Sequence, residues 1–357
     1  MRALIIAGGA GTRLRPLTYR IPKPVIPVVN KPLVQHQIEF LKKHGIREII
    51  LSLYYLAGEI KKVLGDGSGL GVKLFYSVEK KPLGTGGAVK KAAPFFKGEP
   101  LIVLNGDIIT ELALDEVLDF YHKNQASLVL VLTPVEDPTH YGLVVTSKNG
   151  RIEKFLEKPS WDEVTVRTIN AGTYVMNPEI LNRWLETKEF SFERELFPRL
   201  VAQGGRCFGF VNRKYWMDLG SPVKYLKTHF DVMKRKIKLE PAGKLQRRGV
   251  WVGEGSVFAD EKHSLAGPAI VGRNCRILSG AVIEELVTLG DQVVVGANSR
   301  IEKSVLLSGV VVGRGAVIKN SIIGAVVLIE DEAVIENAVV AHASIIRKGS
   351  RISGEMK

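Results

Sequence analysis

The sequence has few cysteines and no long apolar run. Of its 357 residues only two are cysteines, Cys207 and Cys275, and their wide separation excludes a disulfide framework. No stretch approaches the roughly 20 apolar residues that cross a bilayer, and the N-terminus lacks the cleavable apolar segment of a signal peptide. We therefore expect a cytoplasmic protein that has no membrane partner.

The sequence also lacks a motif for reading nucleic acid. Its formal net charge is +13, but the basic residues are dispersed, and no basic stretch is interleaved with aromatic residues. The charge run at residues 233–238 is typical of a solvated helix end or a linker. We expect no nucleic-acid partner, because a surface suited to polyanionic nucleotides explains the charge.

The first two thirds of the chain alternate apolar runs with amphipathic stretches. The length allows two domains. Short apolar runs predict strands at 2–7, 48–53, 72–77, 101–104 and 128–133. Helical periodicity lies between them at 31–44 and 114–124. This alternation is typical of an α/β domain with a parallel sheet, of the Rossmann-like kind.

A repeat of six residues replaces this pattern from about Val250 onward. Aliphatic residues recur at Val271, Ile277, Ile283, Leu289, Val295, Ile301 and Leu307. After a slip of one residue the repeat resumes at Val312 and Ile318, and then at Ile323, Ile329 and Ile335. A β-sandwich would instead show period-two alternation. The repeat predicts a parallel β-helix over 250–357, joined by a linker at 233–249 to a first domain at 1–232.

A glycine-rich segment directly after the first apolar run carries the most information about function. Residues 8–24 read GGAGTRLRPLTYRIPKP, and we call this segment the signature loop. Its glycines can adopt positive φ and let backbone N–H groups approach a phosphate: Gly8, Gly9 and Gly11. Thr12, Arg13 and Arg15 add donors, and the guanidinium of Arg13 matches phosphate oxygens as a fork. Flanking prolines predict that Lys23 lies in a stiff, extended segment.

Further polar residues follow predicted strands. Asp107, in Leu-Asn-Gly-Asp, comes at the carboxyl end of a strand, where open α/β sheets bind ligands, and a carboxylate suits Mg²⁺. In Glu-Lys-Pro, Lys158 is a candidate for binding a sugar phosphate and Glu157 for accepting from sugar hydroxyls. Asn170, in Asn-Ala-Gly-Thr-Tyr, offers donors and acceptors for the same ring.

Taken in order, these segments resemble the signature of nucleoside triphosphate:sugar-1-phosphate nucleotidyltransferases. The order over about residues 1–230 is the signature loop, LGTGG at 83–87, NGD at 105–107, EKP at 157–159, NAG at 170–172 and WMDLG at 216–220. The resemblance implies that Asp107 and Asp218 coordinate a catalytic Mg²⁺. It also implies that Gly142 contacts the sugar through its backbone and that Gly84 and Thr85 belong to the base-recognition segment. Likeness to other hexapeptide proteins implies that the β-helix is left-handed.

The resemblance implies that a sugar 1-phosphate attacks the α-phosphorus of a nucleoside triphosphate and expels pyrophosphate. Arg13, Lys23 and Asp107 are then the expected catalytic residues. Glu79 can only accept hydrogen bonds, which complements the N1–H and N2–H₂ donors of guanine and favours GTP. A solvent-facing Glu79 would instead be a surface charge. The branch that uses GTP and mannose 1-phosphate is the expected one.

Other interpretations remain open at this point. Glucose 1-phosphate with UTP, dTTP or ATP fits the same motifs, because no single residue here distinguishes sugar epimers. A second alternative is a regulatory subunit that binds nucleotide sugars without turnover. Acetyl transfer by the β-helix, through His263 or His342, is a third. The flat faces of stacked repeats instead predict that the β-helix mediates homo-oligomerisation.

Overall fold

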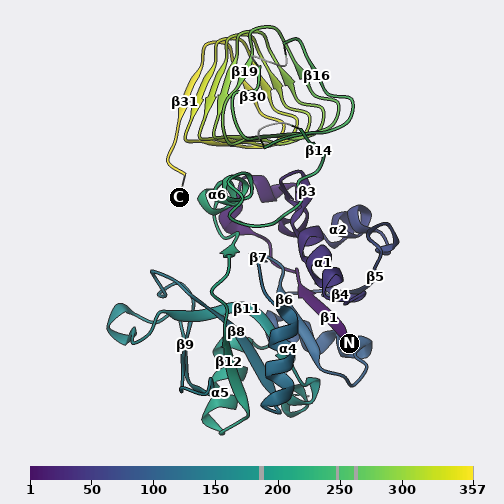
Figure 1. The fold of residues 1–357 in the computed structure, drawn as a ribbon, viewed down its shortest axis with the longest axis vertical. Coiled ribbons are helices and arrows are strands. Elements are labelled where there is room, and N and C mark those ends of the chain that lie inside the picture. The colour runs from purple at the N-terminus through teal and green to yellow at the C-terminus, as the bar shows by residue number, and fades with distance from the viewer. Residues whose placement is uncertain (185–188, 247–248, 261–263, 357) are drawn as a thin grey trace. The chain divides into compact units, whose positions relative to one another are not determined.

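The chain forms two compact units in a computed structural model that describes residues 1–184, 189–246, 249–260 and 264–356 (Figure 1). The first unit comprises Met1–Gly9 and Gln37–Trp216. The second comprises Ala10–His36 and Met217–Lys357. Most of the signature loop therefore folds with the C-terminal part of the chain, although Gly8 and Gly9 belong to the first unit.

The first unit is built on a nine-stranded sheet whose parallel part matches the expected strands. In the order β6-β1-β4-β5, these strands are β6 (Leu101–Asn105), β1 (Arg2–Ile6), β4 (Glu48–Leu53) and β5 (Lys73–Val78). Nearly all their aliphatic side chains are buried, which is why they read as continuous apolar runs. The predicted strand at 128–133 is β8 (Leu128–Pro134).

Three further strands, which the sequence pattern did not predict, make the sheet mixed and not purely parallel. They are β9 (Gly142–Thr146), β10 (Ile152–Glu157) and β11 (Thr168–Met176), and β11 runs antiparallel to both β6 and β8. The turn between β9 and β10, in which Gly150 has φ +84°, is too short for a crossover helix and gives a hairpin. β12 (Cys207–Val211) completes the sheet in parallel with β8.

Short helices connect these strands. They are α1 (Leu33–Lys43), α2 (Ala57–Leu64), α3 (Gly84–Lys91), α4 (Leu114–Lys123) and α5 (Phe197–Ala202). Both predicted helices, at 31–44 and 114–124, are confirmed as α1 and α4. No helix of the described ranges is long and apolar enough to span a membrane. Cys207 and Cys275 are both buried and free, as expected.

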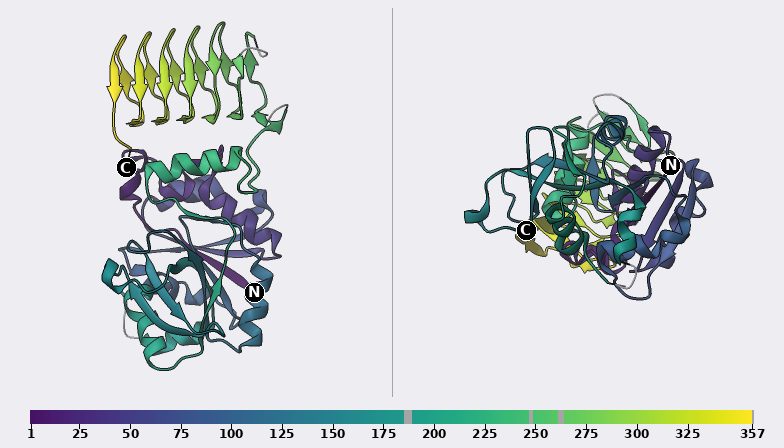
Figure 2. Two further views of the ribbon diagram at one scale, coloured as in Figure 1. Left: turned by 60° about the vertical axis from the view of Figure 1, so that its left-hand side comes forward. Right: turned by 90° about the horizontal axis from the view of Figure 1, so that it is seen from below.

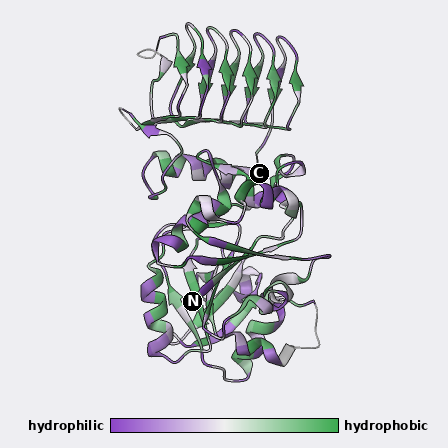
Figure 3. Ribbon diagram, turned by 90° about the vertical axis from the view of Figure 1, so that its right-hand side faces the viewer, coloured by the Kyte–Doolittle hydropathy of each residue, from purple (hydrophilic) through white to green (hydrophobic). Residues whose placement is uncertain are grey.

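The second unit contains the C-terminal repeats as a left-handed parallel β-helix of three sheets (Figures 1 and 2). The first sheet holds β14 (Lys244–Leu245), β15 (Val250–Val252), β17 (Ala269–Val271), β20 (Val287–Leu289), β23 (Val305–Leu306), β26 (Ile322–Ile323) and β29 (Val339–Val340). The second holds β16 (Val257–Phe258), β18 (Arg276–Ile277), β21 (Val294–Val295), β24 (Val311–Val312), β27 (Leu328–Ile329) and β30 (Ile345–Ile346). The third holds β19 (Val282–Ile283), β22 (Arg300–Glu302), β25 (Val317–Lys319), β28 (Val334–Glu336) and β31 (Arg351–Ser353). Figure 3 shows that most of these strands are hydrophobic, with hydrophilic residues among them.

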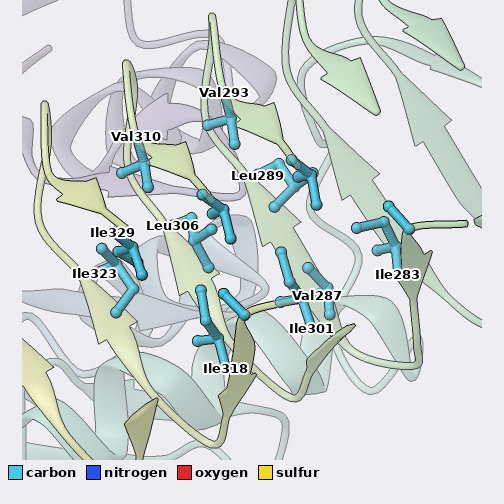
Figure 4. Close-up of a cluster of buried hydrophobic side chains, with 14 of the residues drawn as sticks. Ile283, Val287, Leu289, Val293, Ile301, Leu306, Val310, Ile318, Ile323 and Ile329 are labelled. Atoms are coloured by element: carbon cyan, nitrogen blue, oxygen red, sulfur yellow. The ribbon is translucent and has the colours of Figure 1, made fainter. Parts of the chain in front are cut away.

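The β-helix core corrects the predicted register by one residue. Leu289 pairs with Leu306 rather than Leu307, and Leu306 then pairs with Ile323. Side chains one coil apart are therefore 17 residues apart in this part, as Asn320 and Asn337 are. The shortened corner precedes Leu306, so Leu306 joins the stacked aliphatic side chains of the interior (Figure 4). Leu306 and Leu307 are both buried and apolar, so the six-residue periodicity alone does not show where the slip occurs.

Glycines lie at corners where successive coils approach closely. A Cβ atom at any of Gly253, Gly272, Gly290, Gly296, Gly313 or Gly324 would lie 2.5 or 2.6 Å from backbone atoms farther along the chain. Real Cβ atoms do not approach so closely, so only glycine fits. The small residues that follow the repeat are explained by this packing.

The second unit also contains helix α6 (Pro222–Met233) and a short hairpin of β2 (Pro27–Val28) and β3 (Lys31–Pro32). Helix α6 contacts the first sheet of the β-helix, because His229 Nδ1 lies 3.0 Å from Thr288 Oγ1. Asn30, beside the hairpin, donates to the carbonyl of Leu289 at 2.7 Å. The β-helix thus supports the segment that contains the rest of the signature loop.

Candidate active site

In the first unit, the signature loop begins beside the predicted metal-binding aspartate. Ile6 at the end of β1 pairs with Asn105 at the end of β6. Gly106 donates to the Ile6 carbonyl at 2.8 Å, and a Cβ at Gly106 would lie only 2.7 Å from that oxygen. Gly8 and the half-buried Asp107 therefore follow neighbouring strands at the same edge of the sheet. This is the carboxyl edge that the sequence predicts.

Glu79 lies at the same edge, immediately after β5. It is only 7% exposed, so the interpretation as a surface charge is wrong. Its Oε1 accepts from the Ser52 hydroxyl at 3.0 Å, and Oε2 accepts from the Leu83 N–H at 3.0 Å. A Cβ at Gly8 would lie 3.6 Å from Oε1, so the carboxylate faces the start of the signature loop. Burial raises the pKa of Glu79, against the lowering effect of these two hydrogen bonds.

The LGTGG segment packs against Phe190. Gly84 has φ +72°, and a Cβ there would lie 2.6 Å from the Phe190 carbonyl oxygen. At Gly86 a Cβ would lie 2.2 Å from the Phe190 ring. Both glycines are therefore required by packing, independently of any ligand. The predicted contact between Gly84 and a nucleobase stays a prediction.

All the candidate sugar residues except Asn170 come from the β9–β10 hairpin and the residue that follows it. Gly142 pairs with Glu157, and a Cβ at Gly142 would lie 2.6 Å from the Phe155 ring and 3.1 Å from Glu157 Oε2. Lys158 is exposed, has φ +52°, and donates its N–H to the Tyr141 carbonyl at 2.9 Å. The hairpin therefore places Gly142, Glu157 and Lys158 side by side, as their predicted shared role requires.

Asn170 belongs to a hydrogen-bond network that the sequence did not reveal. Its amide donates to Tyr174 Oη at 3.0 Å, and Tyr174 in turn donates to Glu193 at 3.4 Å. The other oxygen of Glu193 accepts from the hydroxyls of Thr85 and Ser191, each at 2.7 Å. Glu193 thus joins the LGTGG segment to the NAG strand. It lies on a one-turn π-helix at Phe192–Leu196, for which the sequence carries no distinctive signal.

Two carboxylates shape the electrostatics of this region. Burial raises the pKa of Glu157, and the negative charge of Glu193 raises it further. Lys158 and Arg194 oppose this effect. Glu157 is half-buried, so part of its carboxylate stays accessible to a sugar hydroxyl.

In the second unit, the remainder of the signature loop forms a tight turn. Gly11 has φ +61° and precedes a 3₁₀ turn at Thr12–Leu14 that carries the exposed Arg13. The Thr18 hydroxyl donates to the Gly11 carbonyl at 2.8 Å. A Cβ at Gly11 would lie 3.0 Å from the Thr18 side chain and 3.1 Å from Lys23 Cβ. The loop thus folds back on itself and presents Thr12 and Arg13 at its tip.

Lys23 departs from its predicted conformation. Pro22 is extended, but Lys23 begins a 3₁₀ turn at Lys23–Val25 rather than continuing an extended segment. The turn forms because Val25 donates its N–H to the Pro22 carbonyl at 2.9 Å. Lys23 is only 8% exposed, so its position is fixed by packing as well as by the prolines.

Arg13 and Asp218 converge within the second unit, although they are far apart in sequence. A Cβ at Gly220 would lie 2.7 Å from Asp218 Oδ2 and 2.9 Å from Arg13 Nη1. Asp218 is 8% exposed and forms an ion pair with Lys224 in the first turn of α6. Sequence reasoning missed Lys224, whose proximity to Asp218 follows from the strand-to-helix turn at Ser221.

Each of the two predicted metal ligands is a single carboxylate within its own unit. Among the described residues, no group of three or more His, Cys, Asp or Glu side chains could hold a metal ion alone. One or two carboxylates are what Mg²⁺ takes from a protein when substrate phosphates and water complete its coordination. Asp107 and Asp218 belong to different units and each offers one carboxylate. Nucleotidyl transferases of this kind generally use a divalent metal ion.

Similarity to known proteins covers most of the chain. The family model "Nucleotidyl transferase" matches residues 2–235, and "GMPPB C-terminal domain" matches residues 265–356. The mannose-1-phosphate guanylyltransferase 1 of Arabidopsis thaliana is 37% identical over 86% of this chain and 84% of its own length. A UTP–glucose-1-phosphate uridylyltransferase of Synechocystis is 33% identical over 80% of this chain and 82% of its own.

A solved structure resembles a large part of the chain. HddC from Yersinia pseudotuberculosis, complexed with GMP-PN, has a TM-score of 0.55 and 31% sequence identity. It covers 64% of this chain and 97% of the HddC chain. With the matched family model spanning well over half of the sequence and the signature residues placed as above, the chain belongs to the nucleotidyl transferase family.

Proposed function

We propose that this enzyme transfers GMP from GTP to mannose 1-phosphate and releases pyrophosphate, with GDP-mannose as product. The observation that carries the choice of GTP is the buried Glu79 carboxylate beside Gly8. Each of its oxygens accepts one hydrogen bond from the protein, which leaves a second acceptor site on each for the two guanine donors. The mannose-1-phosphate guanylyltransferases among the relatives support the choice of sugar.

The residues act by positioning and by neutralising charge. A phosphate oxygen of the sugar 1-phosphate attacks the α-phosphorus in line, and the bond to the β-phosphate breaks, so no covalent enzyme intermediate is needed. Arg13 stabilises the negative charge that develops on the leaving pyrophosphate. Lys23 holds the triphosphate, Lys158 holds the sugar phosphate, and Gly142, Glu157 and Asn170 orient the sugar. Mg²⁺ held by Asp107 and Asp218 would supply Lewis-acid neutralisation of the phosphate oxygens.

The test is pyrophosphate release by the purified protein with Mg²⁺. GTP, UTP, dTTP, CTP and ATP are each combined with mannose 1-phosphate and glucose 1-phosphate. The proposal expects the highest kcat/KM for GTP with mannose 1-phosphate. A preference for UTP with glucose 1-phosphate, the activity named for the Synechocystis relative, would keep the reaction class and reject the role of Glu79. Absence of turnover with every pair would support a non-catalytic binding subunit.

Replacing Glu79 with glutamine is expected to reduce the preference for GTP over UTP by about tenfold to 100-fold, since a good pair of base contacts contributes about 1–3 kcal/mol of discrimination. The ionised carboxylate is the required form. Because the pKa of Glu79 is raised, GTP affinity should weaken on acidification at a higher pH than the ordinary value of 4.5 would give. KM for GTP measured across pH checks this. In Glu79→Gln that acidic dependence should disappear, and its persistence would contradict the assignment.

The β-helix supports a proposal of self-association through its second sheet. Outward-facing aliphatic residues of consecutive strands align there as an apolar stripe: Val294, Val311, Leu328 and Ile345. An aligned row of exposed aliphatic side chains favours a partner surface over water. The first sheet, by contrast, already packs against α6. A second copy of the chain fits the stripe because an isologous two-fold contact would pair it with itself.

Leu328→Lys is expected to convert an oligomer to a monomer, because it places a charge in the middle of the stripe. Light scattering coupled to size-exclusion chromatography checks the mass. Val334→Lys, on the third sheet, is the matched control and should keep the wild-type mass. A monomeric wild-type protein, or equal effects of the two variants, would contradict the proposal.

The remaining expectations stay predictions. These are the domain division at 1–232, 233–249 and 250–357, the specific use of Mg²⁺ and the cytoplasmic location. His263, one of the two histidines considered for acetyl transfer, lies outside the described residues. His342 makes two hydrogen bonds in the described part of the chain, and the alternative of acetyl transfer stays open.

A further inference from the structure

The imidazole of His342 joins the β-helix to the signature loop within the second unit. Its Nε2 lies 2.6 Å from the carbonyl oxygen of Leu17, and its Nδ1 lies 2.8 Å from the backbone nitrogen of Ala325. An amide N–H can only donate, so Nδ1 must be the acceptor and carry no proton. The proton is therefore on Nε2, which donates to Leu17. Both ring nitrogens are engaged, in one defined neutral tautomer.

The geometry of the β-helix holds this ring in place. His342 follows β29 at a corner, where Gly324 lies in the preceding coil, and a Cβ at Gly324 would lie 2.6 Å from the His342 nitrogen. The absence of a side chain at Gly324 thus lets the His342 backbone approach. Burial lowers the pKa of His342, which agrees with the neutral tautomer. The rigid coils therefore present a fixed donor to Leu17.

Hydrogen bonds within the loop connect the contact at Leu17 to Arg13. Leu17 is fully buried, and the next residue, Thr18, donates its hydroxyl to the Gly11 carbonyl. Gly11 precedes the 3₁₀ turn that carries Arg13, and Leu14 donates its N–H back to Gly11 at 2.9 Å. A shift of the Leu17–Thr18 backbone would move the Gly11 turn and the guanidinium with it.

We propose that His342 is a positioning residue of this enzyme. From the β-helix it fixes the signature loop, and it thereby holds Arg13 where the guanidinium can stabilise the leaving pyrophosphate. The second contact between Asn30 and Leu289 holds the far end of the same segment. The β-helix is thus part of the catalytic apparatus as well as a surface for self-association. The consequence for turnover rests on the proposed function, whereas the consequence for loop order does not.

The test compares His342→Ala, His342→Leu and His342→Gln with the wild-type full chain. Leucine keeps an apolar side chain of similar reach without a donor, so it serves if the alanine variant does not fold. Glutamine retains an N–H donor at a similar distance from the backbone. Ser344→Ala is the matched control, because Ser344 lies on the same turn and its hydroxyl donates to the nearby Ala341 carbonyl at 2.9 Å.

The first measurement is amide hydrogen exchange without substrates. His342→Ala and His342→Leu should accelerate exchange in residues 10–20, while exchange in the β-helix core stays as in the wild type. His342→Gln should restore much of the protection, and Ser344→Ala should not alter it. Unchanged exchange in residues 10–20, or equal acceleration throughout the second unit, would overturn the proposal.

The second measurement is steady-state kinetics. Loss of one hydrogen bond predicts a fall in kcat of about two- to tenfold in His342→Ala and His342→Leu. KM for the sugar 1-phosphate should change little, because the sugar residues lie in the first unit. Accelerated exchange with unchanged kcat would overturn the positioning of Arg13. A wild-type protein without turnover would reject the proposed function and leave the exchange result to decide whether His342 anchors the loop.

Discussion

Arg13→Ala is expected to lower kcat by about 100- to 1000-fold, the loss typical when a preorganised donor to developing charge is removed. The guanidinium stands at the tip of the signature loop, converging with Asp218 at Gly220. Because the charge on pyrophosphate develops in the transition state, KM for mannose 1-phosphate should change far less than kcat. Steady-state kinetics with saturating GTP checks both values.

Arg20→Ala provides the control for Arg13→Ala. Arg20 is also an exposed arginine of the signature loop, and it lies at the end of the 3₁₀ turn at Leu17–Tyr19. It should keep kcat close to the wild-type value. If Arg13→Ala keeps nearly normal turnover, or if Arg20→Ala loses as much kcat as Arg13→Ala, then Arg13 does not stabilise the charge on the leaving pyrophosphate.

Asp107→Asn is expected to reduce kcat by at least about 100-fold, because a metal ion contributes several kcal/mol of charge stabilisation. The substitution keeps the size of the side chain and the turn after β6, but it removes the negative charge that binds a hard cation. The concentration of Mg²⁺ needed for half-maximal activity should rise as well. A titration of activity against Mg²⁺ measures this directly.

Asp115→Asn is the matched control for Asp107→Asn. Asp115 is an exposed aspartate in the first turn of α4, where it pairs with His44. Its variant should show the wild-type dependence on Mg²⁺. If Asp107→Asn also retains that dependence and its kcat, the metal is held elsewhere.

Local sequence patterns predicted the strands whose two faces are both buried, because burial of every side chain leaves a signal within the strand itself. Continuous apolar runs predicted β1, β4, β6 and β8 because both faces of these strands are covered. The hairpin of β9 and β10 and the antiparallel β11 escaped notice, since strand direction depends on pairing partners that are distant in sequence. The slip at Leu306 escaped for a different reason: Leu306 and Leu307 are both apolar, and only stacking on Leu289 distinguishes them.

In the candidate active site, too, local sequence predicted some residues, whereas others depend on partners that are distant in sequence. Gly8 and Asp107 follow the ends of neighbouring strands, as predicted. The pairing of Gly142 with Glu157 across a hairpin was not predicted. Lys224 and Glu193 could not be found, because an isolated lysine or glutamate becomes informative only when its partner is known. Lys23 adopts a turn that the neighbouring prolines did not reveal, since a hydrogen bond between Val25 and Pro22 determines it.

In the C-terminal coils of the β-helix, residues that are 17 positions apart in sequence lie next to one another in space. Arg347 and Glu330 are 17 residues apart and form a hydrogen bond, as do Asn320 and Asn337. A duplication of 17 residues inserted at one corner would therefore lengthen the β-helix by one strand spacing, about 4.8 Å, and would keep each strand in its sheet. A corner can also take one extra residue, because the earlier coils place Val271 and Leu289 18 residues apart and both side chains stay in the core. The position of His342 against the signature loop therefore depends on the number of whole coils before it and not on an exact count of residues.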